Sequence, residues 1–342
     1  MRSMYAARLA TLAPLMLILA CGTEPAPRPT GPGADLAAHR VRLDEAEWSM
    51  PVNVGAPINS RVADLSPVLS PDELSLYFAS DRLGGQGGRD IWVSRRACSD
   101  WEDRECAWGE ATNLGPLINS SAFESCVRLS NDGHLLFFCS DRPGGFGLAD
   151  IYMSRRANPK DDSAWEAPVN VGSPVSTEFS DADSYYLPNV EDGPANLYFT
   201  RTTSELGENG FDIYSARLTR KGEALGPVVP VAELNHPGFG DYGPTVRADG
   251  REVILSSTRP GGIPRPPGTH PFQNADLWMS TRQSVHDPWT PPVNLGRPVN
   301  SERADITPDF SRDARTLVFA SNRPGGLGGQ DIWVTMRTRR SQ

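Results

Sequence analysis

Long hydrophobic runs, lysines and catalytic motifs are all scarce in this chain of 342 residues. The longest apolar run, residues 9–20, is too short to span a bilayer as a helix. Lysine occurs only at 160 and 221, and the net charge of −9 argues against a phosphate-backbone partner. The sequence has no Gly-x-Ser-x-Gly, His-Glu-x-x-His, phosphate-loop or Cys-x-x-Cys motif, and its five histidines are scattered. These absences argue against nucleic-acid binding and against the enzyme classes that carry such motifs.

The first 47 residues read as an export and anchoring segment. Arg2 and Arg8 flank a short positive start, and the apolar run 9–20 then suits the core of a signal peptide. The run ends Leu-Ile-Leu-Ala-Cys, which resembles the bacterial lipobox, with Cys21 as the residue to be lipidated. An ordinary signal peptide with an incidental Cys21 is the alternative. The Pro- and Gly-rich stretch that follows, within 21–47, predicts a tether. By resemblance to the sorted lipoproteins of diderm bacteria, Gly22 in place of Asp implies an outer-membrane lipoprotein facing the periplasm or the cell surface.

One sequence pattern occurs five times in the rest of the chain. The clearest copies, Ser-(Asp/Asn)-Arg-x-Gly-Gly followed by Asp-Ile-(Trp/Tyr), cover 80–92, 140–152 and 321–333. Two degenerate copies cover 200–214 and 258–278. The anchor aspartates are 60, 62, 64 and 55 residues apart. A period of this length, rich in short strands and turns, is typical of a β-propeller.

Each repeat predicts a four-stranded antiparallel blade. In the second copy, strands at 126–129, 134–139 and 150–155 are separated by Asn-Asp-Gly and Pro-Gly-Gly turns, and a short fourth strand lies within 165–172. A fourth-strand segment at 48–55 precedes the first strand triplet, and no such segment follows the last triplet. We therefore expect an all-β, five-bladed propeller over 48–337, with 48–55 completing the blade begun by 305–337, and a short tail at 338–342. Closure of this kind removes free sheet edges.

The Ser-Pro-Asp-Glu turn at 70–73, the Ser-Asp-Arg-Pro-Gly-Gly loop and the Asp-Ile-(Tyr/Trp) strand resemble the WD40-like repeats of TolB-type propellers. The resemblance implies a propeller in the bacterial cell envelope. The chain departs from TolB itself in having one blade fewer and no region like its α/β domain, so a role in the Tol system is not carried over.

Acidic residues precede the first strand of every repeat. Since that strand lines the channel of a propeller, these carboxylates are candidates for a ring at the channel mouth that holds a hard cation such as Ca²⁺ or a basic segment of a partner. The alternative is that each accepts hydrogen bonds within its own loop. The five candidates are Asp64, Glu124, Asp183 (or Asp181), Asp241 and Asp305.

A second repeated set is predicted to be structural. An Arg and an Asp flank each Gly-Gly loop and are expected to pair within the blade, and the aromatic residue after each Asp is expected to pack between blades. The pairs are Arg82 and Asp90, Arg142 and Asp150, Arg201 and Asp212, Arg259 and Asp276, and Arg323 and Asp331.

Four cysteines remain after Cys21, an even number that suggests disulfides in an exported chain. We expect the local pairs Cys98–Cys106 and Cys126–Cys139, with free buried thiols as the alternative. Metal binding by these cysteines is not expected, because no histidine is near.

Departures from the repeat are the better candidates for a binding loop, since loops carry binding residues. The candidates are His236, Phe239, Tyr242, His270 and Phe272. From all of this we expect a lipid-anchored, non-enzymatic platform without a cofactor that binds an envelope protein or glycan. A carbohydrate-active enzyme that uses some of the channel-mouth acids is the second hypothesis, and a cation-stabilised structural module is the third.

Overall fold

The computed structural model describes residues 47–101, 103–188, 194–202, 210–219, 221–266 and 274–338. These residues belong to one compact unit that covers 46–342. The predicted signal peptide at 1–20, Cys21, the tether apart from its last residue, and residues 339–342 of the tail lie outside the described part. Among the described residues, no helix is both long and apolar enough to cross a membrane.

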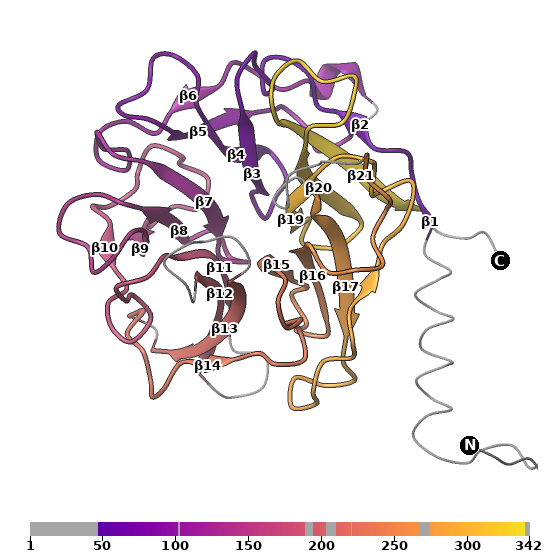
Figure 1. The fold of residues 1–342 in the computed structure, drawn as a ribbon. Coiled ribbons are helices and arrows are strands. Elements are labelled where there is room, and N and C mark those ends of the chain that lie inside the picture. Colours follow the sequence, from indigo (N-terminus) through magenta and orange to yellow (C-terminus); the bar gives the residue numbers. More distant parts are fainter. Residues whose placement is uncertain are drawn as a thin grey trace, which may run out of the picture. The chain divides into compact units, whose positions relative to one another are not determined.

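The unit is a five-bladed β-propeller, and each blade is an antiparallel sheet (Figure 1). Blade 1 consists of β3 (Asp64–Leu69), β4 (Ser75–Ser80), β5 (Asp90–Arg95) and β6 (Thr112–Asn113). Blade 2 consists of β7 (Glu124–Leu129), β8 (Leu135–Ser140), β9 (Asp150–Arg155) and β10 (Val169–Asn170). Blade 3 consists of β11 (Asp181–Leu187), β12 (Ala195–Thr202), β13 (Phe211–Leu218) and β14 (Val229–Pro230). Blade 4 consists of β15 (Asp241–Val246), β16 (Glu252–Ser257), β17 (Asp276–Thr281) and β18 (Val293–Asn294). Blade 5 consists of β19 (Asp305–Phe310), β20 (Thr316–Ser321) and β21 (Asp331–Thr338), together with β1 (Glu47–Trp48) and β2 (Val52–Asn53).

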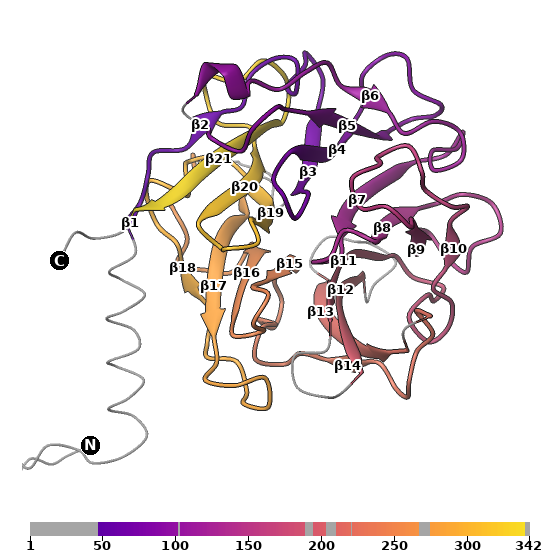
Figure 2. The ribbon, with the colours of Figure 1, turned by 180° about the vertical axis from the view of Figure 1, so that it is seen from behind.

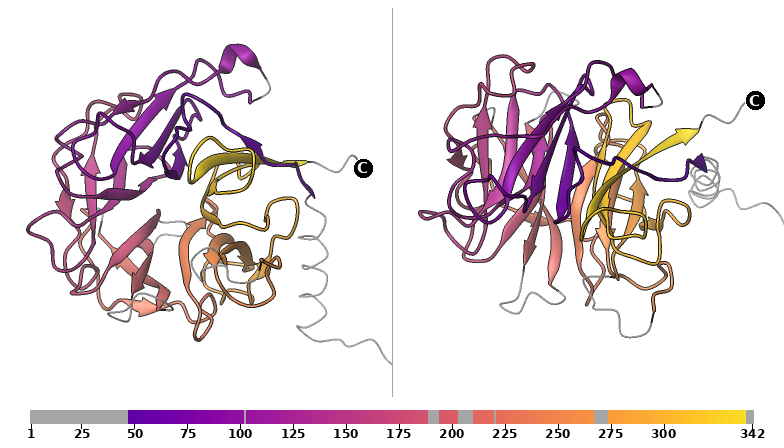
Figure 3. Two further views of the ribbon diagram at one scale, coloured as in Figure 1. Left: turned by 45° about the horizontal axis from the view of Figure 1, so that its top comes forward. Right: turned by 90° about the horizontal axis from the view of Figure 1, so that it is seen from above.

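The predicted closure of the ring is confirmed. Trp48 pairs with Arg337 through β1, and Asn53 pairs with Trp333 through β2, so the start of the propeller supplies the outer strand of its last sheet. In Figure 3 the indigo segment that opens the propeller runs alongside the yellow strand that ends it. The Trp48 ring also lies under the guanidinium of Arg337, 4.6 Å from ring centre to charge.

The core lies between neighbouring blades. The second strand is buried at every position in β4, β8, β16 and β20 and has an apolar middle, as both faces of these sheets are covered. One cluster joins Tyr77 and Val93 of blade 1 to Leu136 and Phe138 of blade 2, and the other clusters join further pairs of blades. Packing of this kind makes each blade depend on its neighbours for burial of apolar surface.

The inner strands β3, β7, β11, β15 and β19 stand next to one another around the channel (Figures 1 and 2). Each contains a β-bulge after its second residue. The third residue of each strand has positive φ, between 45° and 60°. These residues are Ser66, Cys126, Asp183, Gly243 and Thr307. Only one is glycine, so the other four hold a conformation that is unfavourable for L-residues unless the surroundings impose it.

Hydrogen bonds between blades explain how some bulges are held. The Gly243 amide donates to Thr200 Oγ1 of blade 3 at 3.1 Å, and the Thr307 amide donates to Ser256 Oγ of blade 4 at 3.0 Å. The Ser66 amide donates to Thr307 Oγ1 at 3.3 Å. The channel wall is therefore cross-linked from blade to blade by polar contacts.

Candidate functional site: the channel and the loop face

The repeated acids do not form an accessible ring at the channel mouth, and that expectation is wrong in its geometry. Asp64 is fully buried and accepts hydrogen bonds from the Ser60 amide at 2.6 Å, Ser80 Oγ at 2.6 Å and Arg82 Nη2 at 2.8 Å. A loop amide and an arginine bind the acid in this way in every blade, the serine bond recurs in blade 2 through Ser140, and all five acids are fully buried. The pairs are Arg82–Asp64, Arg142–Glu124, Arg201–Asp181, Arg259–Asp241 and Arg323–Asp305.

Two details of the sequence reading are corrected by these pairs. In the third repeat the equivalent acid is Asp181, and Asp183 lies two residues further along β11, at the bulge. The loop arginines pair with the acid at the start of the inner strand and not with the anchor aspartate: Arg82 binds Asp64, although Ser80 lies opposite both Asp64 and Asp90 in the strand register.

The anchor aspartates satisfy the backbone of their own loops, as predicted for a structural set. Asp90 is buried and accepts a hydrogen bond from the Gln86 amide and one from Asn113 Nδ2 at 3.2 Å. Asp150, Asp276 and Asp331 make the equivalent contacts with a loop amide and with Asn170, Asn294 and Asn53.

Asp212 is the exception among the anchor aspartates. Pro230 stands where the other blades have the asparagine, so the amide partner is lost. Within the described part of the chain no hydrogen bond reaches the Asp212 carboxylate, which is half-buried. Burial and, to a lesser degree, the charge of Asp241 raise its pKa. Among the described residues, blade 3 therefore lacks the side-chain amide contact that the anchor aspartates of the other four blades receive from asparagine.

The aromatic residues that follow the anchor aspartates pack between blades, as predicted. Trp92 belongs to the cluster shared by blades 1 and 5, and the guanidinium of Arg82 lies 5.3 Å from its ring centre. The arginine that binds the buried acid is thus covered by aromatic rings on its other side, which holds it in one orientation.

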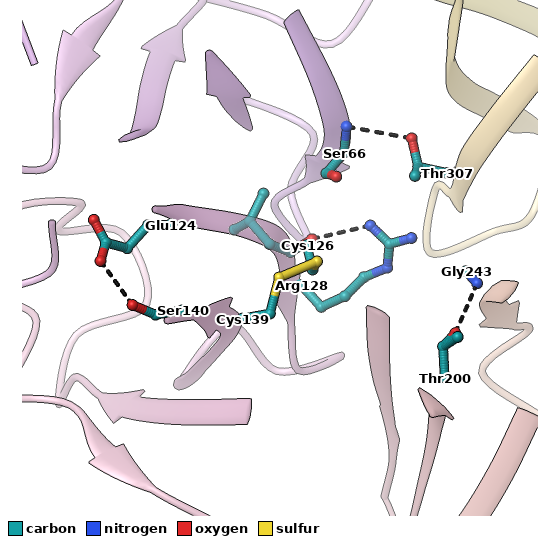
Figure 4. Close-up of a disulfide and its surroundings, with 10 residues drawn as sticks. Ser66, Glu124, Cys126, Arg128, Cys139, Ser140, Thr200, Gly243 and Thr307 are labelled. Carbon is teal, nitrogen blue, oxygen red and sulfur yellow. Dashed lines mark hydrogen bonds between the residues drawn. A yellow bond between two sulfur atoms is a disulfide. The ribbon is translucent and has the colours of Figure 1, made fainter. Parts of the chain in front are cut away.

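Arg128 crosses the centre of the channel (Figure 4). Its guanidinium is buried and donates to the carbonyl oxygen of Val127 at 2.9 Å and, in blade 5, to that of Pro308 at 3.1 Å. Burial raises the pKa of Asp309 to about 7, and the charge of Arg128 opposes this effect. Burial also raises the pKa of Asp183, and Arg128 again opposes it. One arginine therefore faces two carboxyl groups whose charged forms are disfavoured.

These channel residues occupy two repeat positions that face the axis. Asp183 is at the third position of its inner strand, and Arg128 and Asp309 are both at the fifth position. The fifth position holds a different residue in each blade, namely Val68, Arg128, Tyr185, Thr245 and Asp309. A repeat position that varies in this way is a sequence signal for a residue with its own role. Neither Arg128 nor Asp309 was predicted from the sequence.

We call the end of the propeller at which the inner strands begin the loop face. The irregular loop before β15 lies on this face. His236 and Phe239 contact each other with ring centres 5.0 Å apart, and the His236 amide donates to Asp241 Oδ2 at 2.5 Å. Tyr242 packs against Phe211, and burial together with the charges of Asp183 and Asp241 raises its pKa. His270 and Phe272, predicted for the same binding loop, lie outside the described residues.

Exposed apolar side chains also occur in several loops at the loop face. Leu83 is 98% exposed, and four further apolar residues in the loops of blades 5, 1 and 2 are more than half exposed. We call these residues the apolar arc: Leu327, Leu83, Leu117, Phe146 and Leu148. The strand register explains their position in blade 1. Ser80, the last residue of β4, lies opposite Asp64 and Asp90, the first residues of β3 and β5, so the β4–β5 loop is at the loop face.

Both predicted disulfides are confirmed. Cys98–Cys106 closes the loop that precedes Trp108, and Cys126–Cys139 links the bulge of β7 to β8 (Figure 4). The one cluster of potential metal ligands found among the described residues is Cys98, Asp103 and Cys106. Its two sulfur atoms are already bonded to each other, so the cluster does not suit a metal ion.

No protein-family model and no curated protein matches the chain. Among solved structures, it is similar to an alpha-L-arabinofuranosidase from Lactobacillus brevis, with a TM-score of 0.54, 12% identity and coverage of 84% of this chain and 93% of that one. It is also similar to an alpha-L-arabinofuranosidase from Podospora anserina, with a TM-score of 0.52, 11% identity and coverage of 86% and 97%. TolB from Acinetobacter baumannii matches with a TM-score of 0.42 and 17% identity over 82% of this chain and 56% of that one. At identities this low, the likeness to the arabinofuranosidases shows the propeller fold alone.

Proposed function

We propose that this protein is a non-enzymatic binding platform of the cell envelope, held at the outer membrane by a lipid on Cys21 and docking a partner protein on its loop face. The observation that supports binding over catalysis is that the repeated acids have a structural role. All five are fully buried and paired with an arginine of the same blade, so none is available as an acid, a base or a ligand to a cation.

The apolar arc supports the choice of the loop face. Contiguous apolar patches on soluble proteins often mark binding surfaces, and we propose that the apolar arc is part of one. Leu83 and Phe146 emerge from corresponding loops of adjacent blades, and Leu117 comes from the loop between these two blades. A protein surface with complementary apolar side chains is the partner that would remove this area from water.

Photo-crosslinking in intact cells tests the proposal. A photoreactive residue at Leu83 should capture a defined partner, and the same residue at Val229, exposed on the outer strand of blade 3, serves as the control. The substitution Leu327→Asp should abolish capture from position 83 without changing the melting temperature. Equal capture from both positions, or capture that survives Leu327→Asp, would contradict docking at the apolar arc. Loss of palmitate labelling in Cys21→Ser tests the anchor separately.

A carbohydrate-active enzyme is the second candidate, and a specific observation favours it. Asp183 and Asp309 are carboxyls with raised pKa in the channel, and a carboxyl that keeps its proton is what general-acid catalysis at a glycosidic bond requires. Purified protein should be assayed on arabinan and xylan oligosaccharides. Turnover that disappears in Asp183→Asn and in Asp309→Asn, while the variants stay folded, would replace the binding proposal with this one. A melting temperature raised by Ca²⁺ would instead favour a cation-stabilised module.

A further inference from the structure

Asp309 of blade 5 is placed so that it meets the other blades at the channel centre. Its carboxylate is almost fully buried and accepts hydrogen bonds from the Leu69 amide of blade 1 and from Thr245 Oγ1 of blade 4, both at 3.3 Å. Arg128 of blade 2 binds the carbonyl oxygen of the preceding residue, Pro308. One side chain of the closing blade therefore ties both of its neighbours together.

The charged and titratable groups around Asp309 come from two strands. Arg128 faces it from β7, and Tyr185 faces it from β11, where burial and the charge of Asp309 raise the pKa of the phenol. Asp183, also on β11, faces the same arginine. β3 contributes only a backbone amide and β15 only the hydroxyl of Thr245. Burial disfavours the charged form of both carboxyls, and the charge of Arg128 opposes this effect at each of them.

We propose that the channel centre is a proton-sensitive part of the ring: a proton on the buried Asp309 carboxyl, which joins blade 5 to blades 1 and 4, stabilises the folded propeller, and loss of that proton destabilises it. The direction follows from linkage. The pKa of this carboxyl is 3.8 unperturbed and about 7 in the folded protein, so between these values the folded state holds a proton that the unfolded state has released. Asp309 therefore makes the unfolding constant rise about tenfold per pH unit up to pH ~7 and adds no further change above it.

The test is denaturant unfolding at pH 5, 6, 7 and 8 for the native chain and for Asp309→Asn, which keeps the shape and removes the titration. We expect the ratio of the two unfolding constants, native over variant, to rise about a hundredfold between pH 5 and pH 8. Asp313→Asn is the matched control, because this aspartate lies in the β19–β20 turn with its side chain 55% exposed, and its ratio should stay flat. A flat ratio for Asp309→Asn would overturn the proposal.

Two further measurements keep the proposal testable if Asp309→Asn does not fold. Thr245→Val removes a donor to the carboxylate, so the midpoint of the pH dependence should move upward. In the native chain, hydrogen exchange at the Leu69 amide, corrected for the intrinsic rate, should report more frequent opening at pH 8 than at pH 5. An unchanged midpoint of the pH dependence in Thr245→Val would contradict the proposal. Protection of the Leu69 amide that does not depend on pH would contradict it as well.

Discussion

Removing one arginine of the repeated buried pairs tests the central energetic claim about this propeller. Glu124 is fully buried, and Arg142 binds it at 3.0 Å while also donating to the carbonyl oxygen of Ile118 at 2.6 Å. Arg142→Ala leaves a buried carboxylate without its counter-charge, which costs about 3–5 kcal/mol. For a domain of this size, that loss corresponds to a fall in melting temperature on the order of 10 °C.

The matched control is Arg297→Ala. Arg297 binds Glu302 at a similar distance, 2.8 Å, but both side chains are about 60% exposed. An exposed pair contributes about 0–1 kcal/mol, so this variant should unfold almost as the native chain does. Urea unfolding of both variants measures the difference, and the double variant Arg142→Ala with Glu124→Gln should recover much of the loss. Equal destabilisation by Arg142→Ala and Arg297→Ala would refute the assignment of the repeated pairs as buried stabilising elements.

Three further predictions follow from packing, cross-linking and closure. A methyl group at Gly87 would lie 2.3 Å from a backbone carbonyl oxygen of the neighbouring loop, whereas nothing lies within 4 Å of a methyl group at Gly88. Thermal unfolding should therefore show that Gly87→Ala is clearly destabilising and that Gly88→Ala is not. Loss of the Cys98–Cys106 disulfide in a double Ala variant should cost about 2–4 kcal/mol in denaturant unfolding, and a cost near zero would show that the loop holds its shape unaided. Deletion of 47–53 removes β1 and β2 and bares the edge of β21, so light scattering should detect aggregation of the truncated chain, and a stable monomer would argue against closure.

The architecture was predictable because it repeats. Alternating strands and turn residues recur at a regular spacing, and the offset of 48–55 relative to the strand triplets was enough to predict the closure that β1 and β2 provide. The pairing of the two disulfides was also predictable, since each joins cysteines within one loop or one hairpin.

The channel was much less predictable, and the bulge is the physical reason. In β7 the register shifts between Ser125 and Arg128, so the alternation of inward and outward side chains is broken at this point. A period-two reading therefore does not show that Arg128 crosses the axis or that Asp309 meets it there. The partner of Arg82 was equally hidden. Both Asp64 and Asp90 lie opposite Ser80 in the blade, and only the side-chain contacts in the structure show that Arg82 binds Asp64.

The closing blade takes its outer strands from 47–53 and its other three strands from 305–338. A chain emerging from a ribosome or an export channel therefore cannot finish this sheet until residues 305–338 are available. Until then 47–53 has no strand to pair with, although it is synthesised before all of the other blades. The order of synthesis thus makes ring closure a late step in folding.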